Sequence, residues 1–218
     1  MDQSKTYQMT HPAPMVWSHV VTPRPERKDN KGRVFKAAYE GTFVFAPDHP
    51  DWAAISAMLR AEAAAVVPNV EKPNFPADVG STIADAAKTK NRDREWARGK
   101  ILLQAKSSVA KMDGSLLMPP RLFVLLNGKY ESFGVTNERS LASKYFYSGV
   151  LAVGTFSVAG YEGMGGGVAV YLNEVLSLNA GDRIAGGVDP DEKYGDASKF
   201  AQYTGHVSSV DPTIGLPI

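Results

Sequence analysis

The residues able to carry out catalytic or metal chemistry are spread thinly along this chain. Its four histidines, at positions 11, 19, 49 and 206, show no paired ligand spacing, and there is no cysteine. The carboxylates at positions 189, 191, 192 and 196 have the chemistry to bind a hard cation. They lack the spacing of an EF-hand loop, so a solvated acidic loop is the simpler interpretation. We therefore expect no metal ion and no cofactor.

Motifs of enzyme active sites are also absent from the sequence. There is no P-loop, no HExxH, no nucleophile elbow and no dinucleotide fingerprint between a strand and a helix. The glycine cluster at residues 163–167 lacks the Lys-Ser/Thr ending of a phosphate loop and no helix follows it, which favours a hairpin turn. With no nucleophile placed beside a base, we predict that the protein is not an enzyme.

Basic residues, by contrast, gather in two places. Residues 24–36 contain six Lys or Arg and two acids, and residues 88–106 contain seven Lys or Arg and two acids, although the net charge of the chain is only +1. A solvated face explains one such run. Two runs in a nearly neutral chain indicate separate positive patches, and positive patches attract phosphates.

Composition limits the class of protein. The 218 residues are 44% hydrophobic and 22% charged, which excludes global disorder and favours one domain with a packed core. The lack of cysteine fits a reducing cytosol. No apolar run approaches the roughly 20 residues of a membrane span, and the first residues lack the apolar core of a signal peptide. We expect a soluble intracellular protein that does not bind membranes.

Strand patterns dominate the periodicity of the chain. Residues 14–22, 33–46, 99–109 and 121–126 are rich in β-branched and aromatic residues, and in residues 33–46 and 99–109 these alternate with polar residues. A hairpin is predicted for residues 146–161 and 168–178, because a glycine cluster separates two such runs. One long helix is predicted for residues 48–67, capped by Asp48 or Asp51, with Trp52 on its apolar stripe. A short helix is predicted for residues 81–90.

These elements predict a mainly β fold: an OB-fold-like, five-stranded Greek-key barrel with one long helix and loop or helix embellishments. The helix follows the second strand, whereas the common OB-fold has it between strands three and four, so spacing alone does not determine the fold. The predicted organisation is a flexible N-terminus at 1–12, a barrel domain at 13–184 with an insertion at 69–95, and a loop-like C-terminal tail at 185–218.

Three motifs indicate a known family. They are YSG at residues 147–149 with the glycine turn and GVAVYLNEV at 167–175, FVFAP at 43–47 before the helix, and GKILLQAKSS at 99–108. Together they resemble a family of phage-encoded single-stranded DNA-binding proteins, and the likeness covers about residues 14–184. The resemblance implies an OB-fold that binds single-stranded DNA with little sequence preference, during phage replication or recombination in the cytoplasm of an infected host cell.

Members of that group often end in an acidic tail with a terminal aromatic residue that recruits partners, whereas this sequence ends in DPTIGLPI. We therefore do not expect recruitment through the last residues. The expected partner is single-stranded DNA, and other replication or recombination proteins and a second copy of the chain are further candidates.

Candidate DNA contacts follow from charge, strand face and ring type, because binding without sequence readout needs cations along a groove and flat rings for stacking. The third predicted strand and the residues before it supply Trp96, Arg98, Lys100, Gln104 and Lys106. We predict that Trp96 is at least partly exposed and contacts a base; the alternative is a plug in the core. The remaining candidates are Lys36, Tyr39, Tyr145, Tyr147, Arg24, Arg33, Arg92 and Arg94.

The function predicted on these grounds is sequence-independent binding that protects or organises single-stranded DNA. The alternative is a phage structural or assembly β-protein whose basic loops contact other subunits. A nuclease would need an Asp/Glu/His metal cluster, which the sequence does not contain.

Overall fold

The structure is a computed structural model that describes residues 5–28, 30, 32, 34–71, 73–75, 95–111, 113–134 and 144–184. The predicted short helix at 81–90, the predicted tail at 185–218 and three candidate DNA contacts, Arg33, Arg92 and Arg94, lie outside the described residues.

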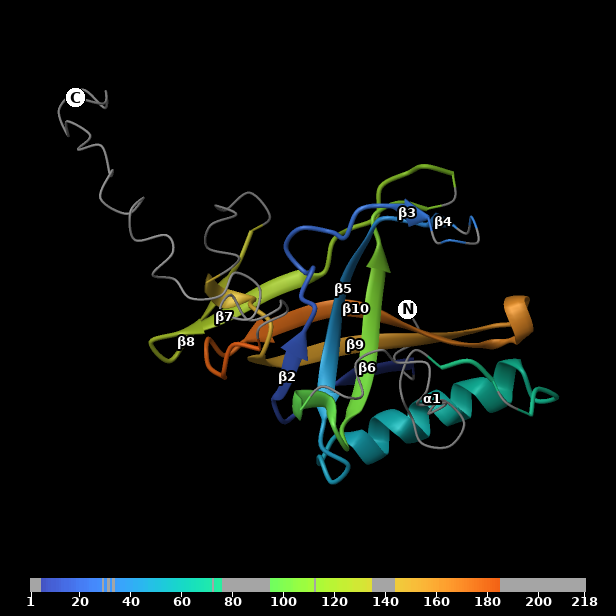
Figure 1. Cartoon of the computed structure of the whole chain (residues 1–218), viewed down its shortest axis with the longest axis horizontal. Helices are drawn as coiled ribbons and strands as arrows, with labels where there is room; N and C mark the ends of the chain where they lie inside the picture. The colour runs from blue at the N-terminus through green and yellow to red at the C-terminus, as the bar shows by residue number, and fades with distance from the viewer. Residues whose placement is uncertain are drawn as a thin grey trace, which may run out of the picture. The chain divides into compact units, whose positions relative to one another are not determined.

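One mixed sheet contains most of the strands. Its order is β6 (Ile101–Ser108), β5 (Ala38–Phe45), β2 (Ala13–Val16), β9 (Val150–Tyr161), β10 (Gly167–Ser177), β7 (Arg121–Leu126) and β8 (Lys129–Ser132), and β1 (Thr6–Gln8) pairs with β9. All neighbours are antiparallel except β7 and β10. The β9–β10 hairpin crosses β5 and β6 at a steep angle (Figure 1). The fold is mainly β and OB-fold-like with one long helix, which confirms the predicted fold class.

The predicted barrel is not closed by a backbone ladder among the described residues, because β6 and β8 are the two ends of the strand order. The gap between β6 and β10 is instead spanned by a side chain. Ser107 Oγ donates a hydrogen bond to the Leu172 carbonyl oxygen, with an O···O distance of 2.5 Å. The sheet therefore curls until β6 and β10 meet without forming a continuous ladder.

The core forms where the apolar faces of these strands meet the helix. Phe43 and Phe45 of β5 and Leu103 and Ala105 of β6 are buried in it, as period-two alternation predicts. Phe43 also meets Phe156 of β9 edge-on, with ring centroids 5.1 Å apart. The aromatic rings of Phe43 and Phe45 therefore belong to the core.

Helix α1 (Trp52–Val66) covers one end of the curled sheet, along the lower edge in Figure 1. Its apolar stripe enters the core through Trp52, Ile55 and Leu59. It passes so close to β9 that a Cβ on Gly160 would lie 2.5 Å from Val66. Glycine is therefore required at position 160 for the helix to pack against this strand.

The prediction of a side-chain cap for the helix is wrong, although the position of the cap residue agrees with it. Asp51 occupies the N-cap position but its side chain makes no capping bond. Its buried carboxylate instead accepts hydrogen bonds from the Tyr7 hydroxyl at 2.8 Å, the Thr10 hydroxyl at 2.7 Å and the His11 amide at 2.8 Å. These bonds attach the N-terminal segment to the start of the helix.

Several element boundaries differ from prediction. The first strand ends at Val16 rather than residue 22, because Trp17 adopts a positive φ of 49°. The second is divided into β4 (Val34–Phe35) and β5, and β4 pairs with β3 (Arg27–Lys28), which lies between the first two predicted strands. The N-terminal segment, predicted to be flexible, contributes β1.

Titration of Asp51 gives a testable prediction. Burial raises the pKa of this carboxyl, but the hydrogen bonds from Thr10, His11 and Tyr7 outweigh burial and lower it to about 2 from 3.8. Because the folded pKa lies below the unfolded value, the stabilisation is complete above about pH 4 and is lost as the pH falls towards 2. Asp51→Asn should lower the free energy of unfolding by roughly 2 kcal/mol at pH 7 and by less near pH 2.

The measurement is chemical unfolding of both proteins across this pH range. Asp48→Asn is the matched control, because the Asp48 side chain is exposed, and it should leave stability unchanged. An equal loss at pH 7 and pH 2 for Asp51→Asn would contradict the proposed role of the carboxylate.

Candidate nucleic-acid interface

The outer face of β5 and β6, opposite to the core, carries a graded series of side chains. Strand register places Val44 opposite Leu102, Thr42 opposite Gln104, and Glu40 opposite Lys106. The face therefore changes along the strands from apolar, through polar, to charged. In OB-folds this face of strands two and three is a common site for oligonucleotides.

Two tryptophans cover the apolar end of this face. Trp17 and Trp96 meet edge-on, with ring centroids 5.5 Å apart. Both are half-buried and pack on a small cluster formed by Val16, Val44, Ala97 and Leu102. Trp96 is thus neither a free stacking platform nor a plug in the main core: one part of the ring packs against the sheet and the other part is accessible. Arg98 and Lys100, which follow it, are exposed.

The charged end of the outer face is built around a buried carboxylate. Glu40 is 7% exposed and accepts a hydrogen bond from Arg24 Nε at 3.1 Å. Lys106 lies opposite it on β6. Burial lowers the pKa of Lys106, and the charges of Arg24 and Arg27 lower it further, while Glu40 acts in the opposite direction. An anionic phosphate placed here would stabilise the charged form of this amine.

A groove of about 380 Å³ borders Lys106 on the side away from Glu40 and β5, between β6 and the end of the β9–β10 hairpin. Gln104, Lys106 and Ser108 line one wall, and Tyr161 and Tyr171 line the opposite wall together with Phe75. The Tyr171 side chain is 43% exposed. This groove combines amine, amide and hydroxyl groups with aromatic rings, the combination that binds single-stranded nucleic acid.

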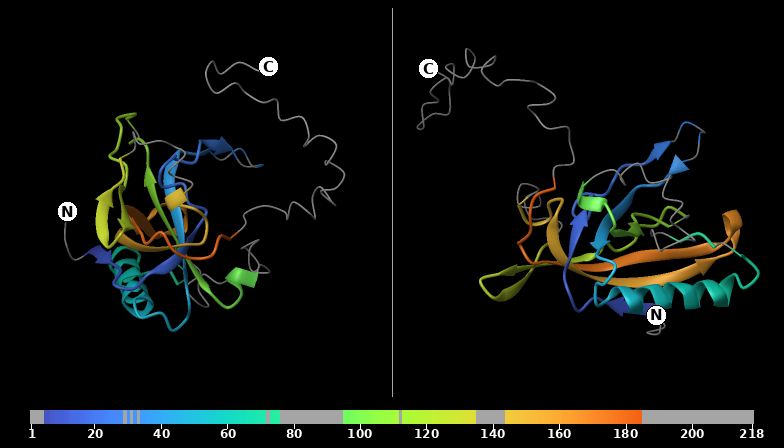
Figure 2. Two further views of the ribbon diagram at one scale, coloured as in Figure 1. Left: turned by 90° about the vertical axis from the view of Figure 1, so that its left-hand side faces the viewer. Right: turned by 60° about the horizontal axis from the view of Figure 1, so that its bottom comes forward.

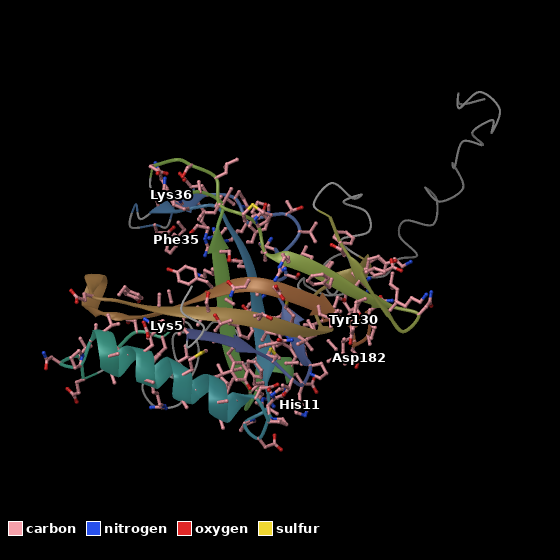
Figure 3. The ribbon with its side chains drawn as sticks, turned by 180° about the vertical axis from the view of Figure 1, so that it is seen from behind. Lys5, His11, Phe35, Lys36, Tyr130 and Asp182 are labelled. Carbon is pink, nitrogen blue, oxygen red and sulfur yellow. The ribbon has the colours of Figure 1, made fainter. Side chains whose placement is uncertain are left out.

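The β3–β4 hairpin adds cations beside the charged end. Arg24 pairs through its backbone with Ala38, and its guanidinium also donates to the Lys36 carbonyl oxygen at 3.3 Å. Arg27 lies over the Phe35 ring, 5.3 Å from the centroid. Figure 3 labels Phe35 and Lys36 on this hairpin. The Lys36 amine is exposed and 3.3 Å from Glu26, so it is a solvated contact that a phosphate can replace.

Tyr145 and Tyr147 both precede β9, because this strand begins at Val150 rather than at residue 146. Tyr145 is half-buried against the main core and meets Phe133 edge-on at 6.3 Å. Tyr147 donates a hydrogen bond to the Gly181 carbonyl oxygen at 2.8 Å and stacks under Arg183 at 4.3 Å. Tyr145 is therefore mainly a packing residue, whereas Tyr147 belongs to an aromatic–guanidinium pair at the surface.

The structure brings together a subset of the predicted contacts. Gln104 and Lys106 share the outer face, and Arg24 is tied to that face through Glu40. Tyr39 does not share it: this half-buried ring lies on the core side of β5, the same side as Phe43 and Phe45, opposite Ser107. The predicted contacts on this face and its loops are Trp96, Arg98, Lys100, Gln104, Lys106, Arg24 and Lys36.

Sequence reasoning missed the second wall of the groove. Tyr171 alternates with the buried Val170 and Leu172, so an aromatic residue on the outward face of a predicted strand was the available signal. Trp17 was missed because it was placed inside a strand, and Phe75 because it falls in the predicted insertion at 69–95. The Arg27–Phe35 contact depends on the β3–β4 pairing, which the sequence did not predict.

Other kinds of site were sought in the described part of the chain. Within it, no group of three or more His, Asp or Glu side chains is arranged to hold a metal ion. None of the described helices is long and apolar enough to cross a membrane.

Sequence comparison and structure comparison give different results. No protein-family model matches this chain, and no curated protein matches it either. Solved structures do match. The single-stranded DNA-binding protein from bacteriophage Enc34 is 14% identical over 88% of this chain and 91% of its own, with a TM-score of 0.56.

Two further structures agree with this result. The Enc34 protein in complex with single-stranded DNA is 14% identical over 85% of this chain and 91% of its own, with a TM-score of 0.53. The gp2.5 single-stranded DNA-binding protein encoded by bacteriophage T7 is 13% identical over 87% of this chain and 93% of its own, with a TM-score of 0.52. Along most of its length, the chain thus has the fold of phage single-stranded DNA-binding proteins.

Proposed function

We propose that the protein binds single-stranded DNA without sequence preference and does so as a binding protein, not as an enzyme. The observation that carries the proposal is the aromatic and cationic groove between β6 and the β9–β10 hairpin, continuous through Lys106 with the outer face of β5 and β6. The shared fold with phage proteins of that activity supports it. Its setting would be phage DNA replication or recombination in an infected cell.

The arrangement suits an unpaired strand better than a duplex. Rings at Tyr161, Tyr171 and the tryptophan pair lie along a path that also carries amines and guanidinium groups. Any base can stack on such a ring, and each stacked base contributes roughly 1–3 kcal/mol. Bases of a duplex are already stacked on one another. Stacking therefore supplies the preference for single strands and charge supplies most of the remaining affinity.

The amide of Gln104 is compatible with this lack of sequence preference. It is half-buried beside Lys106 and borders the groove. An amide both donates and accepts hydrogen bonds, so it can pair with the edge of any base by rotating. Specific readout would need several fixed donors and acceptors, whereas this wall offers one amide and one serine hydroxyl.

A phage structural or assembly protein with basic interaction loops is the second candidate, favoured by the exposed residues Leu116 and Met118 in the loop between β6 and β7. Exposed apolar side chains of this kind often mark contacts with other proteins. This candidate predicts stable particles in gel filtration and no affinity for oligonucleotides. The proposed function predicts the reverse.

Titration with dT oligomers tests the function directly. Several phosphate contacts should make log K fall with log salt by about 0.7 per contact. For roughly 3–5 contacts, affinity should weaken on the order of a hundredfold between about 0.05 and 0.3 M salt, as followed by tryptophan fluorescence. Duplex DNA of equal length should bind much more weakly. Equal affinity for the two forms would reduce the interface to charge attraction and refute the stacking groove.

Tyr171 offers a direct test of the groove. Its exposed ring makes little contribution to packing, so Tyr171→Ala should leave the melting temperature nearly unchanged and weaken dT binding by roughly fivefold to a hundredfold. Tyr130→Ala is the matched control: Tyr130 is 73% exposed but lies on β8, outside this groove. Short dT oligomers should bind the control as tightly as the unmodified protein. Unchanged binding by the Tyr171 variant would exclude this wall from the interface.

The two structurally distinct tryptophans separate binding from folding. Trp52 is 9% exposed within the main core, so Trp52→Ala should cost about 3–5 kcal/mol of stability. Trp96 is half-buried on the small outer cluster, so Trp96→Ala should cost roughly 1–2 kcal/mol of stability and also weaken dT binding at least fivefold. Thermal melts and titrations of both variants provide the comparison. A Trp96 variant that melts as early as the Trp52 variant and binds normally when folded would assign Trp96 to packing alone.

A further inference from the structure

Among the described residues, the sheet has an unpaired edge at the β7–β8 hairpin. β8 lies at one end of the strand order, and all four of its residues are exposed. The hairpin projects from the body of the fold in Figure 2. In Figure 3, Tyr130 lies far across the view from Phe35 and Lys36. An exposed edge of this kind is a template for another strand.

The hydrogen-bond register shows which groups of β8 face outward. Phe133 N donates to the Leu122 carbonyl oxygen at 2.8 Å, so these two residues form a hydrogen-bonded pair. Such pairs alternate in an antiparallel ladder, which places Lys129 and Glu131 in the next ones. Their backbone groups bond to β7, and those of Tyr130 and Ser132 point away from it.

The turn supports the same register. Asn127 and Gly128 have φ values of 51° and 75°, as a two-residue primed turn requires. In that turn the flanking residues, Leu126 and Lys129, form the closing hydrogen-bonded pair. The outward N–H and C=O of Tyr130 are therefore available to a second strand.

We propose that β8 pairs with β8 of a second copy of this chain in an antiparallel, two-fold symmetric register centred on Tyr130. In this register the two Tyr130 residues exchange their backbone hydrogen bonds, and the sheet continues from one copy into the other. Lys129 of each copy then lies opposite Glu131 of the other. The interface is self-complementary in charge, with two lysine–glutamate pairs.

The alternative two-fold register is centred on Ser132, the other residue with an outward-facing backbone. It sets Glu131 opposite Phe133, which is 8% exposed in the core, and forms no pair of opposite charges. Short, charged edge strands often serve to prevent pairing. Here the two charges have opposite sign and flank the central residue symmetrically, so they favour self-pairing instead.

Burial of apolar surface adds to these bonds. Tyr130 lines a groove of about 340 Å³ whose other apolar walls are Phe123, Val153 and Leu176. Directly opposed side chains in an antiparallel pair lie on the same face of the sheet. The second Tyr130 ring therefore lies beside the first and shields that groove, which explains a highly exposed tyrosine on this strand.

Charge reversal tests this pairing without nucleic acid, so the inference does not rest on the proposed function. The full chain should sediment as a dimer at high concentration. Lys129→Glu and Glu131→Lys should each weaken the dimer by roughly tenfold or more, because each creates two like-charge pairs. Both side chains are exposed, so the melting temperature of the monomer should not change.

Mixing the two variants is the decisive measurement. The combination restores opposite charges at both positions, so an equimolar mixture should form a heterodimer, and the double variant Lys129→Glu/Glu131→Lys should dimerise like the unmodified chain. A chain that stays monomeric at every concentration overturns the proposal. So does a dimer insensitive to either reversal, or single-variant monomers that fail to associate when mixed. Short dT oligomers should bind all variants equally, which separates this outcome from a failure of the DNA-binding function.

Discussion

The burial of β5 on both of its faces is the constraint on which the candidate interface depends. Seven of its eight residues are buried and only Tyr39 is half-buried. The inner face contributes Phe43 and Phe45 to the core, which hydrophobic burial explains. The outer face includes Glu40, and a charge that is buried without a partner is strongly unfavourable. Arg24 and Lys106 must therefore be held where they neutralise this carboxylate, and the tryptophan pair must cover Val44.

This requirement gives the outer face its order before any ligand binds. Arg24 and Lys106 are held in place by Glu40 and by the strands, so their side chains lose less conformational entropy when they contact a phosphate. Lys106 is half-buried, so its amine is partly removed from water in the free protein, and this burial lowers its pKa. A phosphate that binds here meets cations that are already positioned and partly desolvated. The same contacts that stabilise β5 thus prepare the site.

The sequence predicted the elements whose periodicity is local, and failed where long-range contacts decide. Alternation identified β5 and β6, the glycine cluster between two β-rich runs identified the β9–β10 hairpin, and the 3.6-residue stripe identified α1. Alternation divides a strand into two faces without saying which aromatic residues become accessible, so Tyr39 was chosen and Tyr171 was missed. The role of Asp51 depends on residues about 40 positions earlier. The strand β8, with four exposed residues, carries no apolar alternation from which it could be predicted.

The fold also separates two surfaces with different chemistry. The groove beside β6 has rings, an amine and an amide, and its neighbours on the β3–β4 hairpin are cationic. The groove beside β8 is lined mainly by apolar side chains, its Glu174 is paired with Arg121, and the strand itself carries one charge of each sign. The positive charge of the first surface attracts phosphates, whereas the balanced charges of the second surface do not. The strand β10, which pairs with both β9 and β7, contributes Tyr171 to one groove and Glu174 and Leu176 to the other. Association through β8 would leave the β6 groove of each copy open, so that one dimer holds two such grooves. A long DNA strand bound in the first groove would then meet the second groove at a raised effective concentration.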